Sequence, residues 1–226
     1  MIYRSLQNRI GYSFKDEELL LLALTHSSFA NENHNKSFFN ERIEFLGDAV
    51  LELISSEFFY KMTPEMPEGV MTKKRAAAVC EPALAFCARE IGLEKNIRLG
   101  RGEEQTGGRD RDSIISDALE SLIGAIYLDG GFEEAKKFVL SFVLNDLDHK
   151  KLYYDSKSAL QEYAQGHLGA EPVYELIGES GPDHMRVFTM QVSVAGNVLG
   201  VGEGHTKKAA QAAAALEALK KYYSED

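Results

Sequence analysis

Apolar residues in the first part of the chain recur mostly every three or four positions, which is the spacing of one face of an α-helix. The pattern predicts helices over residues 16–25, 41–60, 81–91, 113–127 and 133–144. Alternating runs of β-branched residues, which are typical of strands, are few before residue 145. We therefore expect an all-α region, with glycines between residues 92 and 108 and a turn at residues 129–131 separating helices.

The pattern changes near Tyr154. A short helix is expected over residues 158–165, then strands over 172–180, 186–194 and 198–204, and an alanine-rich helix over 207–222. The polar segment 149–157 suits a connection, in which residues 155–157 cap the following helix. We expect an all-α domain, residues 1–150, followed by a small α+β domain of order α-β-β-β-α, residues 155–224.

The composition is that of an ordinary globular protein, with 44% hydrophobic and 27% charged residues. The longest apolar run, residues 19–24, is far shorter than the roughly 20 residues of a membrane helix, and no signal segment opens the chain. A cytoplasmic protein without a membrane partner is expected. Cys80 and Cys87 lack ligand spacing, so both are expected to pack as small apolar residues and not to form a disulfide framework or zinc site.

The formal net charge is −10, and both parts of the chain contribute: residues 1–150 carry 18 basic and 25 acidic residues, and residues 151–226 carry 7 and 10. Taken alone, this charge argues against a nucleic-acid partner, because phosphate binding needs a basic surface. The local placement of the charges decides the question, since a divalent cation bound at an acidic site inverts the sign of the charge there.

Acidic residues form a stripe on the predicted helix 41–60. Glu41, Glu44 and Asp48 stand at i, i+3 and i+7 and therefore share one face, which Glu52 extends. Gly47 lies among the apolar residues of the opposite side. A glycine inside a helix costs about 1 kcal/mol relative to alanine, which suggests that another helix approaches closely there.

A second predicted helix carries Asp117 and Glu120 one turn apart. Their neighbours are strongly apolar, so this helix should be largely buried and its acids costly unless they are compensated. Four carboxylates from two packed helices offer the hard oxygen ligands that Mg²⁺ takes. Alternatively, these acids could lie on solvated helix faces or form ion pairs with Arg42 or residues 73–75. The spacing therefore suggests a metal site but does not identify the reaction.

Five motifs follow one another in a fixed order: LTHSS at residues 24–28, NERIEFLGDAVLE at 40–52, LGRGE at 99–103, GGR at 107–109 and DALESLIGAIYLDGG at 117–131. Together they resemble the ribonuclease III family. Ile43 departs from the family, which usually has leucine at this position. The resemblance covers about residues 5–145 and continues into the C-terminal region.

The resemblance implies a metal-dependent endoribonuclease that cleaves double-stranded RNA as a homodimer. It implies staggered cuts that leave 5′-phosphate and 3′-hydroxyl ends, in RNA processing that includes ribosomal precursors. The positions that match the family's metal ligands are Glu44, Asp48, Asp117 and Glu120. Asp48 and Glu120 match the central catalytic residues, and Glu41 and Glu68 match further acids near the cleavage site and the subunit interface.

The cofactor implied is Mg²⁺, with Mn²⁺ as a substitute and no organic cofactor. An ion held by these acids would activate a water and stabilise charge on the departing 3′ oxygen, so no side-chain nucleophile is needed. If a second ion binds, Glu41 is the candidate helper. His26 and Ser27, adjacent at a helix end, are expected to pack or cap.

The C-terminal α-β-β-β-α order, with GHTKKAAQAAA at residues 204–214, resembles the double-stranded-RNA-binding domain. Such domains read duplex shape and 2′-hydroxyls over about 16 base pairs. The contacts implied are Gln161, Glu162 and Gln165 in the first helix, His184 in the turn after the first strand, and a phosphate clamp of Lys207, Lys208 and Gln211. Gln211 stands where the family usually has a third basic residue, so modest and salt-dependent affinity is expected.

Three other interpretations are open. The chain could be a non-catalytic double-stranded-RNA-binding protein on the same fold, but the four intact acids argue against this. A metal-dependent phosphohydrolase of small molecules would leave the C-terminal region unexplained. A helical adaptor would give no role to two acidic faces.

Overall fold

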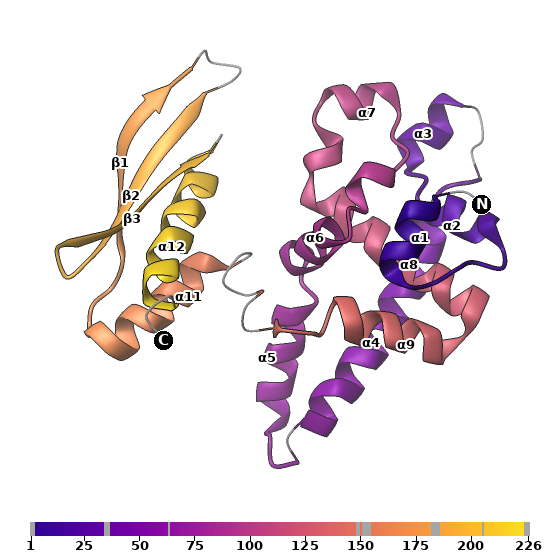
Figure 1. Cartoon of the computed structure of the whole chain (residues 1–226), viewed down its shortest axis with the longest axis horizontal. Helices are drawn as coiled ribbons and strands as arrows, with labels where there is room; N and C mark the ends of the chain where they lie inside the picture. Colours follow the sequence, from indigo (N-terminus) through magenta and orange to yellow (C-terminus); the bar gives the residue numbers. More distant parts are fainter. Residues whose placement is uncertain are drawn as a thin grey trace. The chain divides into compact units, whose positions relative to one another are not determined.

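The computed structural model describes residues 3–33, 37–62, 64–147, 150, 155–181, 186–204 and 206–223. The chain divides into two compact units, residues 1–147 and 148–226, both of which are drawn in Figure 1. The boundary expected near Tyr154 lies outside the described residues. In the described part of the chain, no helix is long and apolar enough to cross a membrane.

The first unit is helical, as predicted. Its α-helices are α1 (Arg4–Ile10), α2 (Glu17–Ala23), α3 (Ser27–Glu32), α4 (Glu41–Met62), α5 (Glu68–Ala78), α6 (Glu81–Glu90), α7 (Arg101–Gln105), α8 (Asp112–Gly130) and α9 (Phe132–Phe142). Short 3₁₀ turns, η1 (Glu94–Asn96) and η2 (Gly108–Asp110), lie on either side of α7.

The sequence predicted α2, α4, α6, α8 and α9, but it missed the other four α-helices among the described residues of this unit. Three of these, α1, α3 and α7, have only five to seven residues, which is too short for a clear periodic signal. In α5 only Ala78 is buried, so the helix has almost no apolar stripe. The turn expected at residues 129–131 begins later, because α8 continues to Gly130 and Gly131 follows with a positive φ of 83°.

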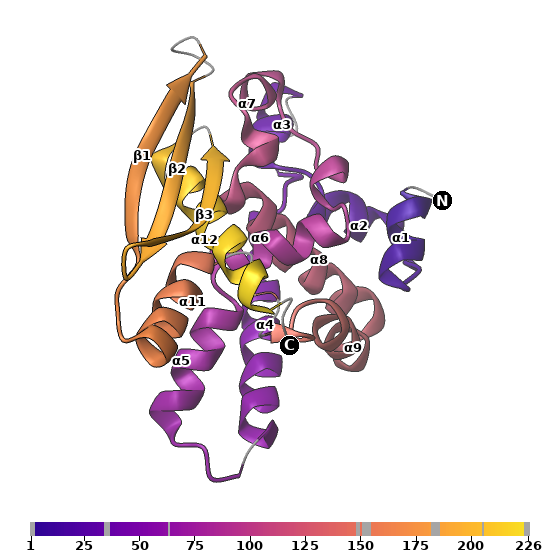
Figure 2. The ribbon, with the colours of Figure 1, turned by 60° about the vertical axis from the view of Figure 1, so that its left-hand side comes forward.

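Helix α8 forms the centre of the first unit. Most of its residues are buried, and the helices packed around it are α2, α4, α6 and α9, whose positions can be followed in Figures 1 and 2. Leu119, Leu122 and Ile123 have no exposed surface. The prediction that this helix is largely buried is therefore confirmed.

Two glycines allow α4 and α8 to touch through their backbones. A Cβ atom on Gly47 would lie 1.8 Å from the carbonyl oxygen of Glu120, and one on Gly124 would lie 2.4 Å from the carbonyl oxygen of Ile43. Neither distance can be relieved by rotating a side chain, because the atoms met are main-chain atoms. The close approach expected at Gly47 is confirmed, and it places the acidic residues of both helices next to each other.

The second unit has the predicted α-β-β-β-α order. Its elements are α11 (Ser156–Tyr163), a π-helical turn η3 (Ala164–Leu168), β1 (Val173–Ser180), β2 (Val187–Val194), β3 (Asn197–Gly204) and α12 (Lys207–Tyr223). The strands form one antiparallel sheet of order β1-β2-β3. Asp155 occupies the N-cap position of α11, but its side chain makes no capping hydrogen bond.

Small residues join α12 to the sheet. A Cβ atom on Gly200 or Gly202 of β3 would lie 2.2 Å from main-chain atoms of Ala214. Ala214 and Ala218 are fully buried on the facing side of α12, together with Leu160 of α11. The alanines therefore do more than favour a helix, because their size lets α12 lie directly on β3.

We predict that Gly47→Ala destabilises the first unit by about 3 kcal/mol, because the new methyl group overlaps the backbone of α8. The matched control is Gly69→Ala in α5, where a Cβ would meet nothing within 4 Å, so stability should be unchanged or rise by up to about 1 kcal/mol. Urea unfolding of the two variants measures both changes. Equal free energies of unfolding would contradict the proposed backbone contact.

Candidate metal site and RNA-binding surface

Three of the four predicted metal ligands form one cluster. Glu44 of α4 and Asp117 and Glu120 of α8 each offer a carboxylate oxygen, and these oxygens lie within 4.8 Å of one another. All three side chains are half-buried at the contact between the two helices. The cluster therefore depends on the backbone contact at Gly47 and Gly124.

Burial and mutual repulsion raise the pKa values of these acids. Burial raises the pKa of Glu44 to about 7, and the charge of Asp117 adds to the rise. Burial likewise raises the pKa of Glu120 to about 8, with the charge of Asp48 as the next cause. Burial also raises the pKa of Asp117, and the charge of Glu81 adds to it. Such shifts mark a site whose negative charge lacks compensation.

Asp48 and Glu41 lie at the exposed edge of this cluster. Asp48 follows Glu44 by one turn of α4 and is solvent-exposed, and its oxygens are not part of the group within 4.8 Å. Its charge nevertheless raises the pKa of both Glu120 and Glu44. Glu41, also exposed, raises the pKa of Glu44 and Asp117. Both carboxylates therefore add to the negative potential at the cluster.

Basic side chains do not balance the cluster. Within the described residues, no ion pair reaches Glu44, Asp48, Asp117 or Glu120. Arg75 instead pairs with Glu52 at 2.9 Å and donates to Ser56 Oγ at 2.7 Å. Clustered carboxylate oxygens without a counter-cation fit a hard divalent metal ion. The ion-pair alternative is thus not supported for this cluster.

His26 has a structural role. The backbone N–H of Ser28 donates to His26 Nδ1 at 3.3 Å, which caps α3, and the ring also bonds to Ser28 Oγ at 2.8 Å. Its charge lowers the pKa of Asp117, but only against the larger opposing effect of burial. Cys80 and Cys87 are not joined in a disulfide, and Cys87 is buried and Cys80 half-buried, in agreement with the expected packing role.

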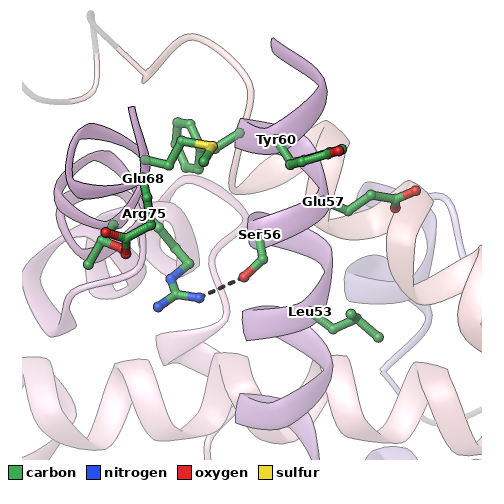
Figure 3. Close-up of a pocket in the computed structure, with 9 residues that line it drawn as sticks. Leu53, Ser56, Glu57, Tyr60, Glu68 and Arg75 are labelled. Carbon is green, nitrogen blue, oxygen red and sulfur yellow. Dashed lines mark hydrogen bonds between the residues drawn. The ribbon is translucent and has the colours of Figure 1, made fainter. Parts of the chain in front are cut away.

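Glu68 lies apart from the acidic cluster. It starts α5 and lines a pocket of about 460 Å³ between α4 and α5, where Thr72 Oγ1 donates to its Oε1 at 2.8 Å. Figure 3 shows Tyr60, Ser56 and Arg75 around the same pocket. Glu68 does not contribute to the raised pKa of any clustered acid.

The described residues that are predicted to contact RNA lie on α11, η3 and α12 of the second unit. Gln161 and Glu162 of α11, Gln165 of η3, and Lys207 and Lys208 of α12 are exposed, whereas Gln211 of α12 is half-buried. His184 lies outside the described residues. Lys207 Nζ lies 5.7 Å from the centre of the Phe188 ring. Gln211 Oε1 accepts a hydrogen bond from Lys157 Nζ at 2.7 Å, a contact that the sequence did not predict.

Comparison with known proteins decides the family. A family model described as Ribonuclease-III-like matches residues 16–147, and one described as Double-stranded RNA binding motif matches residues 156–222. The chain is 48% identical over 219 residues to Ribonuclease 3 of Caldanaerobacter subterraneus subsp. tengcongensis, with 96% of each covered. The chain belongs to the ribonuclease III family. The resemblance predicted from the motifs is confirmed.

Other ribonuclease III proteins match similarly. Ribonuclease 3 of Bacillus licheniformis is 46% identical over 222 residues, with 97% of this chain and 89% of that protein covered. A structure of the nuclease domain of ribonuclease III from Campylobacter jejuni matches 62% of this chain and 94% of its own, with a TM-score of 0.59 and 44% identity. That structure is described as flexible in a region involved in dimer formation.

Family membership favours the catalytic interpretation. This ribonuclease III chain is an endoribonuclease, because its relatives over nearly the whole length carry an enzyme's name and it retains all four predicted acids. The match of the second unit to an RNA-binding motif argues against a phosphohydrolase of small molecules. The clustered acids argue against a helical adaptor.

We predict that Glu120→Gln stabilises the metal-free protein at pH 8. Folded Glu120 keeps its proton up to about pH 8, whereas its ordinary pKa is 4.5, so folding takes up a proton between these values. Stability therefore falls as the pH rises through this window, and glutamine removes the loss. The expected gain is about 1–2 kcal/mol at pH 8, after allowance for solvent screening, and close to zero at pH 5.

Urea unfolding in EDTA at both pH values tests this prediction. Glu65→Gln, at an exposed position between α4 and α5, serves as the control that removes one carboxylate elsewhere. A gain for Glu120→Gln that is no larger than that of the control, or that is the same at pH 5, would count against the raised pKa.

Proposed function

We propose that this protein hydrolyses phosphodiester bonds in both strands of double-stranded RNA and leaves 5′-phosphate and 3′-hydroxyl ends at staggered cuts. The observation that supports this most is the cluster of Glu44, Asp117 and Glu120, which has no counter-cation among the described ion pairs. Such a cluster suits metal-assisted phosphoryl chemistry, and the neighbouring unit matches an RNA-binding motif.

Magnesium is the proposed ion, with manganese as a substitute and no organic cofactor. The donors are carboxylate oxygens from two rigid helices, which suit Mg²⁺ because it takes oxygen ligands in an octahedron completed by water. When bound, the ion supplies Lewis acidity that activates a water and neutralises charge on the departing 3′ oxygen. The raised pKa values of Glu44 and Glu120 mean that ligand binding must displace protons there.

We assign a separate role to each acidic residue of the site. Glu44, Asp117 and Glu120 hold the ion, and Asp48 contributes a further carboxylate from the exposed edge of α4. We assign the central catalytic roles to Asp48 and Glu120 because they match the family's central catalytic positions, and the charge of Asp48 adds to the effect of burial in raising the pKa of Glu120. We propose that Glu41, which is exposed, orients the attacking water or helps to hold a second ion.

A homodimer is proposed, with one site for each RNA strand. Helix α4 exposes large apolar side chains that a monomer would leave in water: Phe45 is 80% exposed, Leu53 58% and Tyr60 72%. Apolar surface of this kind often marks a protein interface. Because Phe45 adjoins Glu44, an interface at this position would bring two acidic clusters near each other.

The second unit is proposed to hold the duplex. Gln161, Glu162 and Gln165 would meet one minor groove, and Lys207, Lys208 and Gln211 would meet phosphates across the major groove. His184 is proposed for the neighbouring minor groove. We assign catalysis to residues 1–150 and RNA binding to residues 155–224, and we propose ribosomal and messenger RNA precursors in the cytoplasm as substrates.

Cleavage of an end-labelled RNA duplex of about 30 base pairs tests the activity, with binding scored in parallel. Wild type with Mg²⁺ should give short products with 3′ overhangs, and EDTA or Glu120→Gln should lower cleavage at least about 100-fold while binding survives. Glu65→Gln should cleave like wild type. Tight binding without cleavage in Mg²⁺ and in Mn²⁺ would favour the non-catalytic alternative.

The proposed dimer predicts a change in mass. Phe45→Ser should shift the protein toward the monomer in sedimentation velocity, because it removes the most exposed large apolar side chain described in α4. Leu168→Ser removes an apolar side chain that is 43% exposed in the second unit, and it should leave the dimer intact. A wild-type protein that sediments as a monomer at micromolar concentration would overturn the homodimer.

A further inference from the structure

The face of α12 proposed to bind phosphates has two lysines, and lacks the third basic residue that the double-stranded-RNA-binding domain usually has. Lys207 and Lys208 open the helix, and Gln211 follows on the same face one turn later. A basic residue at this third position would place three cations along one stretch of RNA backbone. Gln211 is neutral, so the start of the helix supplies two positive charges on this face, not three.

Lys157 of α11 brings a positive charge to the same place. Its Nζ donates to Gln211 Oε1 at 2.7 Å, so the ammonium lies beside the side chain that lacks the charge. The ammonium also lies 5.1 Å from the centre of the Tyr174 ring, where a cation–π contact holds it. These two contacts, from α12 and β1, fix the direction of an otherwise flexible side chain.

The Lys157 charge remains available to a ligand. Among the described residues, no carboxylate forms an ion pair with it. The side chain is half-buried, so part of it faces solvent. Glutamine and tyrosine orient the ammonium without neutralising it, and two of its three N–H groups remain free to donate after the bond to Gln211.

Lys157 also adjoins the other predicted RNA contact. Gln161 follows it by one turn of α11, and both line a pocket of about 230 Å³ together with Ser158, Glu171 and Tyr174. The side chain therefore extends from the helix proposed for the minor groove to the face proposed for phosphates. A cation at this junction can reach a phosphate that borders both grooves.

We infer that Lys157 supplies the third positive charge of the phosphate clamp, and that Gln211 is the acceptor that positions it. This inference rests on the RNA-binding function proposed for the second unit. A lysine at position 211 would place a second ammonium beside that of Lys157, and the two would repel each other. A basic residue at 211 and a lysine at 157 are therefore alternative ways to supply one charge.

The test is the salt dependence of duplex binding, measured with the full-length protein in EDTA over a series of KCl concentrations. Lys157→Met keeps an apolar stem over Tyr174 and removes the charge. The slope of log affinity against log salt should become shallower by about 0.9, and affinity near 0.1 M salt should fall about 5- to 10-fold. Lys157→Arg should keep the wild-type slope, because it keeps the charge.

Moving the positive charge from position 157 to position 211 gives the most decisive test. The double variant Lys157→Met with Gln211→Lys should recover the wild-type slope, since the third cation then comes from α12 itself. Lys220→Met is the matched control: it removes the same charge near the far end of α12, and its slope should not change. Lys207→Met tests the clamp independently and should make the slope shallower.

The outcomes separate this inference from the proposed function. If Lys207→Met makes the slope shallower but Lys157→Met does not, the role of Lys157 is overturned while RNA binding by the unit stands. The role of Lys157 is also overturned if Lys157→Met weakens binding equally at every salt concentration, or if Lys157→Arg fails to preserve the slope, because Lys157 would then act through packing. If neither lysine affects the slope, the proposed RNA-binding face itself fails.

Discussion

The contact between the backbones of α4 and α8 determines whether this protein has a metal site. Glycine at positions 47 and 124 lets the two helices approach until main-chain atoms meet. At this separation, carboxylates from different helices share one small volume, and burial together with repulsion raises the pKa of Glu44 and Glu120. The same geometry that makes the metal-free protein hold several carboxylates close together would supply the ligands of the proposed divalent ion, so the repulsion and the proposed function have one origin.

The two units reach stability in different ways, and each way suits its role. The first encloses α8 in large apolar side chains, which keeps the acids of two helices in a fixed geometry. The second packs alanine against glycine over a small core, and its charged groups lie on the outside of the helices. A rigid interior suits catalysis at one point, whereas an exposed charged surface suits contact along a duplex.

The sequence predicted most of the architecture, because the long helices have clear apolar periods and the strands alternate. It also paired the acids of α4 and α8 through their spacing and the family motifs. Other features depend on tertiary placement: Asp48 stands outside the tight cluster although it shares a helix face with Glu44, and Arg75 pairs with Glu52. The bond from Lys157 to Gln211 joins positions 54 residues apart, which no local pattern reports.

The contact between the alanines of α12 and the glycines of β3 constrains the two faces of α12 differently during evolution. The face of α12 that packs on β3 has no spare volume. Larger residues at Ala214 or Gly202 would therefore destabilise the unit and be selected against, so the position of the helix on the sheet should change little during evolution. The outer side of α12 carries no such constraint. Charged residues on the solvent-facing side can move from one element to a neighbouring one without repacking the interior. The affinity for a polyanion can therefore change in small steps while the fold stays the same.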